Sequence, residues 1–172
     1  MELAWHAEES NRFGTAEFIQ YCRTLGTEPY ICVNLGTGTQ DEAQSWVEYC
    51  NGTGNTYWTN LRREHGYPEP FNVKYWGLGN EMYGGWQIGA LDATDYVKKA
   101  REFAKAMLWT DPSIQLVSCG HNGWSDWDRI VLEGLARLPV GIVVASAGAS
   151  VPEGLPRDRV IVADLLPGEA MA

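Results

Sequence analysis

The chain has 172 residues, of which 45% are hydrophobic and 20% charged, a composition that fits one globular domain and excludes a disordered or fibrous protein. Its formal net charge of -9 would repel nucleic acid and anionic membranes, so we expect a neutral partner and no nucleic acid or membrane partner. The four cysteines are widely spaced and form no C-x-x-C pair, which indicates neither a zinc site nor a disulfide framework. No leader-like start and no bilayer-length apolar run is found, so we expect a cytoplasmic protein.

Helical and strand patterns alternate along the chain. Helices are predicted where apolar side chains recur at spacings of three and four, and they cover residues 14–25, 41–50, 92–109 and 127–135. Strands buried on both faces are predicted for short apolar runs, which span residues 29–35, 73–79 and 114–119. Residues 51–72 are rich in Gly, Asn, Thr and Pro, and they predict a long surface loop.

The alternation of strand and helix predicts a parallel sheet covered by helices, either a barrel or an open doubly wound sheet. No glycine-rich nucleotide-binding motif follows any strand, and its absence favours the barrel. A complete (β/α)8 barrel needs about 200–250 residues, whereas this chain has three clear strands and at most two more near its end. The expected fold is therefore α/β, a partial (β/α)8 TIM barrel that is not closed.

The second predicted strand ends in Asn80 and Glu81, followed by a glycine-rich loop with Trp86. In parallel βα folds the catalytic groups lie at the carboxyl ends of strands, where a carboxylate beside an amide can act on a sugar. The 12% of aromatic residues also suits carbohydrate, whose apolar faces stack on rings. The alternative is that Glu81 caps the next helix or pairs with a surface lysine, and position alone does not decide.

Other polar residues give weaker signals. His6, His65 and His121 lie far apart on predicted loops, so we expect ordinary loop histidines and no metal site. Asp126 and Asp128 begin a predicted helix, where acidic side chains interact favourably with the helix dipole, and we interpret them as capping residues.

Three long segments resemble, in order and spacing, the α-L-arabinofuranosidases of glycoside hydrolase family 51. These segments are LAWHAEESNRFGTAEF (3–18), PYICVNLGTGTQDEAQSWVEYCNG (29–52) and LRREHGYPEPFNVKYWGLGNEMYGGWQIG (61–89). The resemblance implies a barrel whose fourth strand ends in the Asn-Glu pair. It implies that Glu81 is the general acid/base catalyst, that Asn80 hydrogen-bonds the sugar 2-hydroxyl, and that Trp5 lines the arabinose site. A buried loop anchor is the alternative for Trp5.

The resemblance further implies a retaining glycosidase that releases terminal arabinofuranose from arabinan, arabinoxylan or other arabinose-containing oligo- or polysaccharides. Such an enzyme needs two carboxyl groups and no cofactor. Members of the family are commonly homo-oligomers, and we expect that state for the full-length parent only.

The sequence departs from the family in two places. Tyr83 and Gly85 stand where the family typically has Asp and Pro, which bears on fine specificity. After about residue 137 the likeness ends, and no segment matches the strand that supplies the family's nucleophile. We therefore expect residues 1–137 to be a fragment of the catalytic barrel and residues 138–172 to be a divergent tail. The alternatives are a noncatalytic or nonfunctional sugar-binding fragment, or another glycosidase of the same clan.

Overall fold

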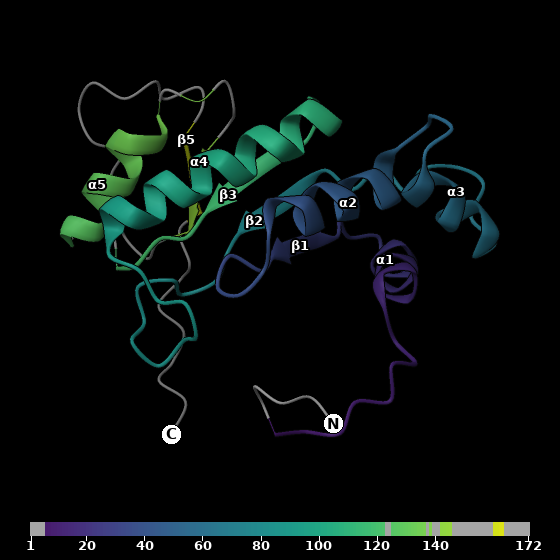
Figure 1. Ribbon diagram of the computed structural model, residues 1–172, viewed down its shortest axis with the longest axis horizontal. Coiled ribbons are helices and arrows are strands. Elements are labelled where there is room, and N and C mark those ends of the chain that lie inside the picture. Colours follow the sequence, from purple (N-terminus) through teal and green to yellow (C-terminus); the bar gives the residue numbers. More distant parts are fainter. Residues whose placement is uncertain (1–5, 123–124, 137, 139–141, 146–159, 164–172) are drawn as a thin grey trace.

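A computed structural model describes residues 6–122, 125–136, 138, 142–145 and 160–163 of the chain. Five strands form one parallel sheet in which each strand pairs with the next along the sequence. The strands are β1 (Tyr30–Val33), β2 (Tyr75–Leu78), β3 (Gln115–Ser118), β4 (Ile142–Ala145) and β5 (Val160–Ala163). This order confirms the predicted partial barrel, with three early strands and two near the end (Figure 1).

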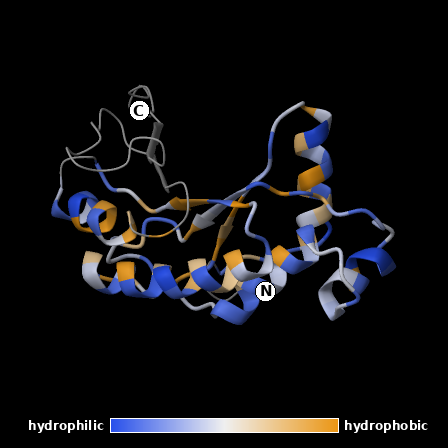
Figure 2. Cartoon of the chain, turned by 90° about the horizontal axis from the view of Figure 1, so that it is seen from above, coloured by the Kyte–Doolittle hydropathy of each residue, from blue (hydrophilic) through white to orange (hydrophobic). Residues whose placement is uncertain are grey.

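Helices alternate with the first strands, with one helix before β1 and two between β1 and β2. They are α1 (Thr15–Thr24), α2 (Gln40–Asn51), α3 (Tyr57–Glu64), α4 (Ala93–Thr110) and α5 (Asp126–Leu135). Figure 2 shows α2, α4 and α5 as a layer along one side of the sheet. No helix in the described part of the chain is both long enough and apolar enough to cross a membrane.

The core lies between the sheet and this helical layer. Alternate residues of the strands are buried, as in Ile31 and Val33 of β1, and Trp76 of β2 is 0% exposed. The other face has residues of mixed exposure, where Tyr30 occupies the space above Gly77. A β-carbon at position 77 would lie 2.3 Å from the Tyr30 hydroxyl, so a side chain there would require the Tyr30 ring to move.

The prediction of one long loop over residues 51–72 is wrong, because this segment contains α3. Arg62 of α3 is 0% exposed, and its guanidinium donates to the backbone carbonyls of Tyr49 at 2.9 Å and Tyr67 at 3.1 Å. These hydrogen bonds stabilise a helix within a segment whose Gly, Asn and Thr residues have low helix propensity, although α3 itself contains no glycine.

The strands β4 and β5 lie in the segment predicted to diverge from the family, residues 138–172. Their pairing extends the parallel sheet beyond β3. Apart from Leu138, the remainder of that segment lies outside the described residues, and the boundary near residue 137 stays a prediction.

Candidate active site at the carboxyl edge of the sheet

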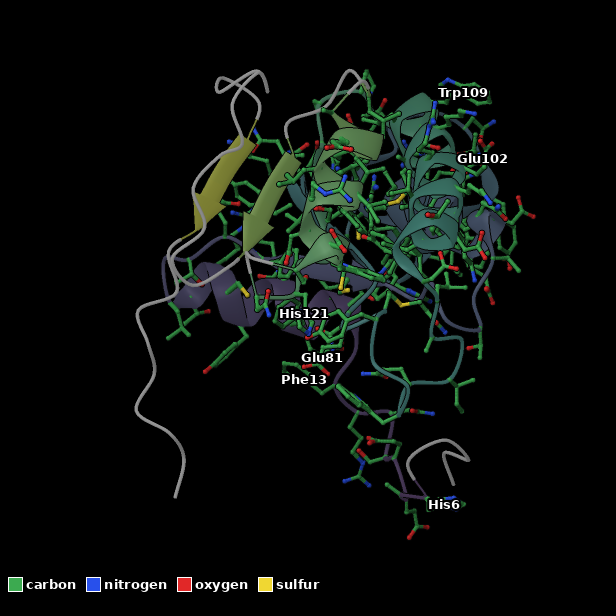
Figure 3. All side chains as sticks on the ribbon, turned by 90° about the vertical axis from the view of Figure 1, so that its left-hand side faces the viewer. His6, Phe13, Glu81, Glu102, Trp109 and His121 are labelled. Atoms are coloured by element: carbon green, nitrogen blue, oxygen red, sulfur yellow. The ribbon has the colours of Figure 1, made fainter. Side chains whose placement is uncertain are left out.

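The loops that follow β1, β2 and β3 leave the sheet at the same level. Leu78, the last residue of β2, pairs in register with Val33 of β1 and Ser118 of β3. Because parallel strands end at one edge, the segments after them meet there. Figure 3 shows Glu81 and His121 at this carboxyl edge, well separated from Glu102 of α4.

A sharp backbone turn carries Asn80 and Glu81 out of the sheet. Gly79 has φ +77° and Glu81 has φ +46°, so two left-handed residues flank Asn80. A left-handed conformation costs a residue with a side chain about 1–2 kcal/mol. A β-carbon at Gly79 would lie 2.7 Å from the Cγ of Met82, so glycine is required at that position. Such strain persists where surrounding structure enforces it, and it is frequent at functional sites.

The Glu81 carboxylate is exposed and accepts a hydrogen bond from the side-chain amide of Gln87 at 3.3 Å. Neither alternative role for Glu81 is found in the described part of the chain. Asp92 caps the next helix, α4, by accepting from the backbone N–H of Asp95 at 2.9 Å. None of the ion pairs among the described residues includes Glu81.

Aromatic side chains form a wall next to Glu81. The half-buried Tyr83 ring contacts His121, with ring centroids 4.3 Å apart, and also Trp127 at 5.6 Å and Trp86 at 6.2 Å. Burial raises the pKa of Tyr83, and the negative charge of Glu81 raises it further. The Trp86 side chain is 72% exposed, so its ring is open to a ligand.

Sequence reasoning missed the contact of His121 with Tyr83 beside Glu81, since we expected His121 to be an ordinary loop histidine. The only signal available was its position just after the third strand, and the contact with Tyr83 depends on packing between two loops. Trp127 was missed as a site residue for the same reason, and Tyr83 was noted only as a departure from the family motif.

Asp128 fixes the loop that bears His121. It is 4% exposed, and its carboxylate accepts from the backbone N–H of His121 at 2.7 Å and from the Ser125 hydroxyl at 2.8 Å. Asp126 is exposed and pairs with Arg129 at 3.2 Å. Both aspartates lie in the first turn of α5, as predicted, but Ser125 is the N-cap residue. Asp128 therefore positions a loop as well as beginning a helix.

The described residues line hollows of different sizes. A small one of about 270 Å³ lies at the carboxyl edge, where Asn34, Asn80 and Gln87 contribute to its lining, and Glu81 is not among its lining residues. A larger one of about 940 Å³ lies between α1, α2 and α3 and involves none of the residues that surround Glu81. The small hollow therefore adjoins the turn that carries Asn80 and Glu81.

The other histidines lie apart from this edge. His65 follows α3, and its Nδ1 is 3.0 Å from the Tyr49 hydroxyl. No group of three or more His, Cys, Asp or Glu side chains suited to a metal ion occurs within the described ranges. Trp5, predicted to line the arabinose site, lies outside the described residues.

Comparison with known proteins gives matches over most of the chain. The family model described as "Alpha-L-arabinofuranosidase 1 domain" matches residues 1–133. A probable α-L-arabinofuranosidase C of Aspergillus flavus is 56% identical over 132 residues, which is 77% of this chain and 26% of the relative. An intracellular exo-α-(1→5)-L-arabinofuranosidase 1 of Bacillus subtilis is 47% identical over 138 residues, which is 77% of this chain and 28% of the relative. The chain thus spans about a quarter of the length of these curated relatives.

Solved structures agree with this result. The arabinose complex of the Thermotoga maritima α-L-arabinofuranosidase has a TM-score of 0.77 and 51% identity, and the match covers 84% of this chain and 30% of that one. The family 51 α-L-arabinofuranosidase of Thermotoga petrophila has a TM-score of 0.77 and 49% identity, covering 88% of this chain and 31% of that one. The chain therefore belongs to the α-L-arabinofuranosidases of glycoside hydrolase family 51 and forms part of their (β/α)8 barrel.

Proposed function

We propose that this chain carries the acid/base side of an α-L-arabinofuranosidase active site, with Glu81 as the catalytic carboxyl group. The observation that carries this proposal is the left-handed turn that holds Glu81 out at the carboxyl edge of a parallel sheet, next to an aromatic wall. In barrel enzymes this edge holds the catalytic groups. The names of the relatives favour the same activity.

In the proposed mechanism, neutral Glu81 first donates its proton to the glycosidic oxygen while a second carboxylate attacks the anomeric carbon. The leaving group departs, and a covalent glycosyl intermediate remains. Glu81, now ionised, then removes a proton from water, whose oxygen attacks the same carbon and releases the sugar. The two carboxyl groups of a retaining enzyme lie about 5–5.5 Å apart, so the nucleophile must come from a segment facing Glu81.

Asn80 is the proposed partner of the sugar 2-hydroxyl. Its side chain is exposed beside Glu81 and lines the small hollow. A hydrogen bond that strengthens as positive charge develops at the anomeric carbon lowers the barrier selectively. We retain Trp5 as a proposed wall of the arabinose site.

The proposed substrate is a terminal arabinofuranosyl group on an arabinose-containing oligo- or polysaccharide. The exposed Trp86 ring offers a flat apolar face near Glu81, and the net charge of -9 suits a neutral ligand. The proposal includes no cofactor. We also keep the cytoplasm as the proposed location and homo-oligomers as the proposed state of a full-length parent.

A second candidate function is sugar binding with little or no hydrolysis. The first turn of α5 contains two acidic residues, and both are already engaged. Asp128 is buried and accepts hydrogen bonds from the residues that precede α5, while Asp126 pairs with Arg129. Neither is placed to act as a nucleophile, and without one retaining hydrolysis slows by orders of magnitude.

Turnover of p-nitrophenyl α-L-arabinofuranoside by the purified chain tests the proposal. The informative variants are Glu81→Gln, which removes the ionisable group, and Glu102→Gln, which changes an exposed glutamate of α4 that pairs with Lys105. We expect Glu81→Gln to lose about 10²–10⁴-fold in turnover, because hydrolysis of the glycosyl intermediate needs Glu81 as general base even though p-nitrophenolate leaves without protonation. Glu102→Gln should match the unchanged chain. Measurable turnover that is equal in the two variants would refute the role of Glu81. No turnover together with arabinose binding, measured by calorimetry, favours the second candidate.

A further inference from the structure

Two buried side chains connect the ends of β2 and β3 beneath the turn that carries Glu81. Tyr96 of α4 is 0% exposed, and its hydroxyl donates to the carbonyl oxygen of Leu78 at 2.8 Å. The same hydroxyl accepts from the backbone N–H of Cys119 at 2.8 Å. The Cys119 sulfur in turn accepts from the backbone N–H of Met82 at 3.3 Å. We call these contacts the Tyr96–Cys119 bridge.

Cys119 is itself held firmly. It is 7% exposed, and its carbonyl oxygen accepts from the indole N–H of Trp127 at 2.9 Å. The Trp127 ring also packs on Tyr96, with centroids 5.1 Å apart. The backbone N–H, the sulfur and the carbonyl of Cys119 are therefore all engaged, by α4, by the turn after β2, and by α5 respectively.

The bridge holds the residues on both sides of the strained turn. Leu78 precedes the turn and Met82 follows it, and between them lie the left-handed Gly79 and Glu81. The Glu81 side chain is exposed, and it accepts a hydrogen bond from the side-chain amide of Gln87, in the same loop. Backbone hydrogen bonds within the loop also hold the turn, from Gly84 N–H to the Glu81 carbonyl and from Leu91 N–H to the Met82 carbonyl. The side-chain contacts that hold the turn come from Tyr96 and Cys119 and not from Glu81 itself.

We propose that Tyr96 and Cys119 are positioning residues that hold the Glu81 backbone left-handed and so aim its carboxyl group. The effect on catalysis rests on the proposed function, whereas the effect on the backbone does not. Neither residue has to touch a substrate, because both act through the peptide groups of Leu78 and Met82. A merely structural role would stabilise the core and leave the conformation of Glu81 unchanged.

Nuclear magnetic resonance of the isotope-labelled chain tests the positioning. A left-handed residue gives a strong Overhauser effect between its own amide and α protons, so Glu81 reports its own backbone conformation. We expect this signal to be lost in Tyr96→Phe, which removes the bridging hydroxyl oxygen. We also expect it to be lost in Cys119→Val, which removes the sulfur acceptor. We expect Cys119→Ser, which keeps an acceptor, to retain it.

Matched controls separate positioning from general loss of packing. Tyr49→Phe removes a hydroxyl that contacts His65 in the helical layer, and Cys50→Val replaces a cysteine of α2 that is 0% exposed. Both controls should keep the Glu81 signal. If Tyr96→Phe does not fold, the comparison of Cys119→Val with Cys119→Ser decides. The proposal is overturned if Cys119→Val keeps the signal, or if Cys50→Val loses it as well.

Hydrolysis of two arabinofuranosides tests the catalytic consequence. A methyl leaving group needs protonation, whereas p-nitrophenolate leaves without it, so a misplaced acid slows the methyl glycoside more. We expect kcat/KM for the methyl relative to the p-nitrophenyl glycoside to fall about tenfold or more in Cys119→Val and to recover in Cys119→Ser. If the Glu81 backbone changes in Cys119→Val but the ratio of the two kcat/KM values does not, the bridge does not orient the carboxyl group for catalysis. If the chain without substitutions shows no turnover, the proposed activity is refuted, while the resonance measurement still decides the positioning.

Discussion

The backbone of Gly89 lies against the backbone of Gly36, so closely that a β-carbon on Gly89 would be 2.6 Å from the Gly36 Cα. A β-carbon on Gly36 would likewise lie 2.4 Å from the carbonyl oxygen of Ile88. The loop after β2 therefore rests on the loop after β1. This contact places Gln87, which donates a hydrogen bond to Glu81.

The substitution Gly89→Ala should destabilise the protein by about 1–3 kcal/mol, because it adds a clash to a residue with positive φ. Gly89 has φ +80°, so an alanine there is strained even without the contact. Gly85→Ala is the matched control in the same loop, since a β-carbon at Gly85 meets nothing within 4 Å. The free energies of unfolding in urea give the comparison, and equal values for both variants would contradict the close packing.

Replacing Arg62 should cost more than replacing an exposed arginine. Its guanidinium donates to carbonyl oxygens of residues 49, 50, 67 and 68, and the side chain is 0% exposed. Arg62→Leu removes this donor from the carbonyls of residues 49, 67 and 68, at about 1–3 kcal/mol for each group that stays unsatisfied. The Cys50 carbonyl still accepts from the backbone N–H of Phe71 at 2.7 Å. Arg62→Lys keeps the charge but lacks the planar fork, so we expect an intermediate loss.

The control for Arg62 is Arg101→Leu, which changes an exposed arginine on α4. Urea unfolding should place Arg62→Leu well below Arg101→Leu in stability, and amide exchange should accelerate first in α3. Similar stability for both variants would show that the buried hydrogen bonds contribute little.

The regular elements were predictable because their patterns are local. The strand β2 is an apolar run between turn residues, and α4 has a continuous apolar face that begins after an N-cap aspartate. By contrast, α3 was missed because its buried residues are Thr59 and Arg62, which no hydrophobic period reveals. The helix is stabilised by hydrogen bonds from Arg62 to backbone carbonyls outside α3, such as that of Tyr49. The local composition does not reveal these partners.

The candidate site was only partly predictable. Position at a strand end singled out Asn80 and Glu81, and the family resemblance assigned their roles. The left-handed conformation of Glu81 was not predictable, because a glutamate has no preference for positive φ and the enforcing contacts come from β3 and α4. The contact between Tyr83 and His121 joins residues 38 positions apart, 121 minus 83, and needs the folded sheet.

Stability at low pH should depend on Asp111, which ends α4. Burial raises its pKa, but hydrogen bonds from Ser113 and Asn51 lower it by more, so the pKa lies below the usual value. A depressed pKa means that the stabilisation is present above the unfolded value of about 3.9 and is lost as pH falls through the folded value. Asp111→Asn should therefore be less stable than the unchanged chain at pH 7, with a difference that shrinks in acid.

Urea midpoints measured from pH 7 to pH 3 test this dependence on Asp111. Asp126→Asn serves as the control, because Asp126 is an exposed carboxyl group whose ion pair with Arg129 contributes little. A pH-independent difference between Asp111→Asn and the unchanged chain would show that the ionised carboxylate is not what stabilises the end of α4.

Thiol chemistry should report the opening of the helical layer. The four cysteines are free, and burial raises the pKa of Cys50 to about 12 and that of Cys32 to about 11. At pH 8 only about one Cys50 thiol in 10⁴ is then ionised, and the thiolate is the reactive form. Ellman's reagent should therefore modify Cys50 slowly in native buffer and quickly in urea. The variant Cys50→Ala should show one fewer modified thiol per chain, and the loss should be confined to the slow phase. Immediate reaction of all four thiols in native buffer would contradict the closed packing of α2 against α4.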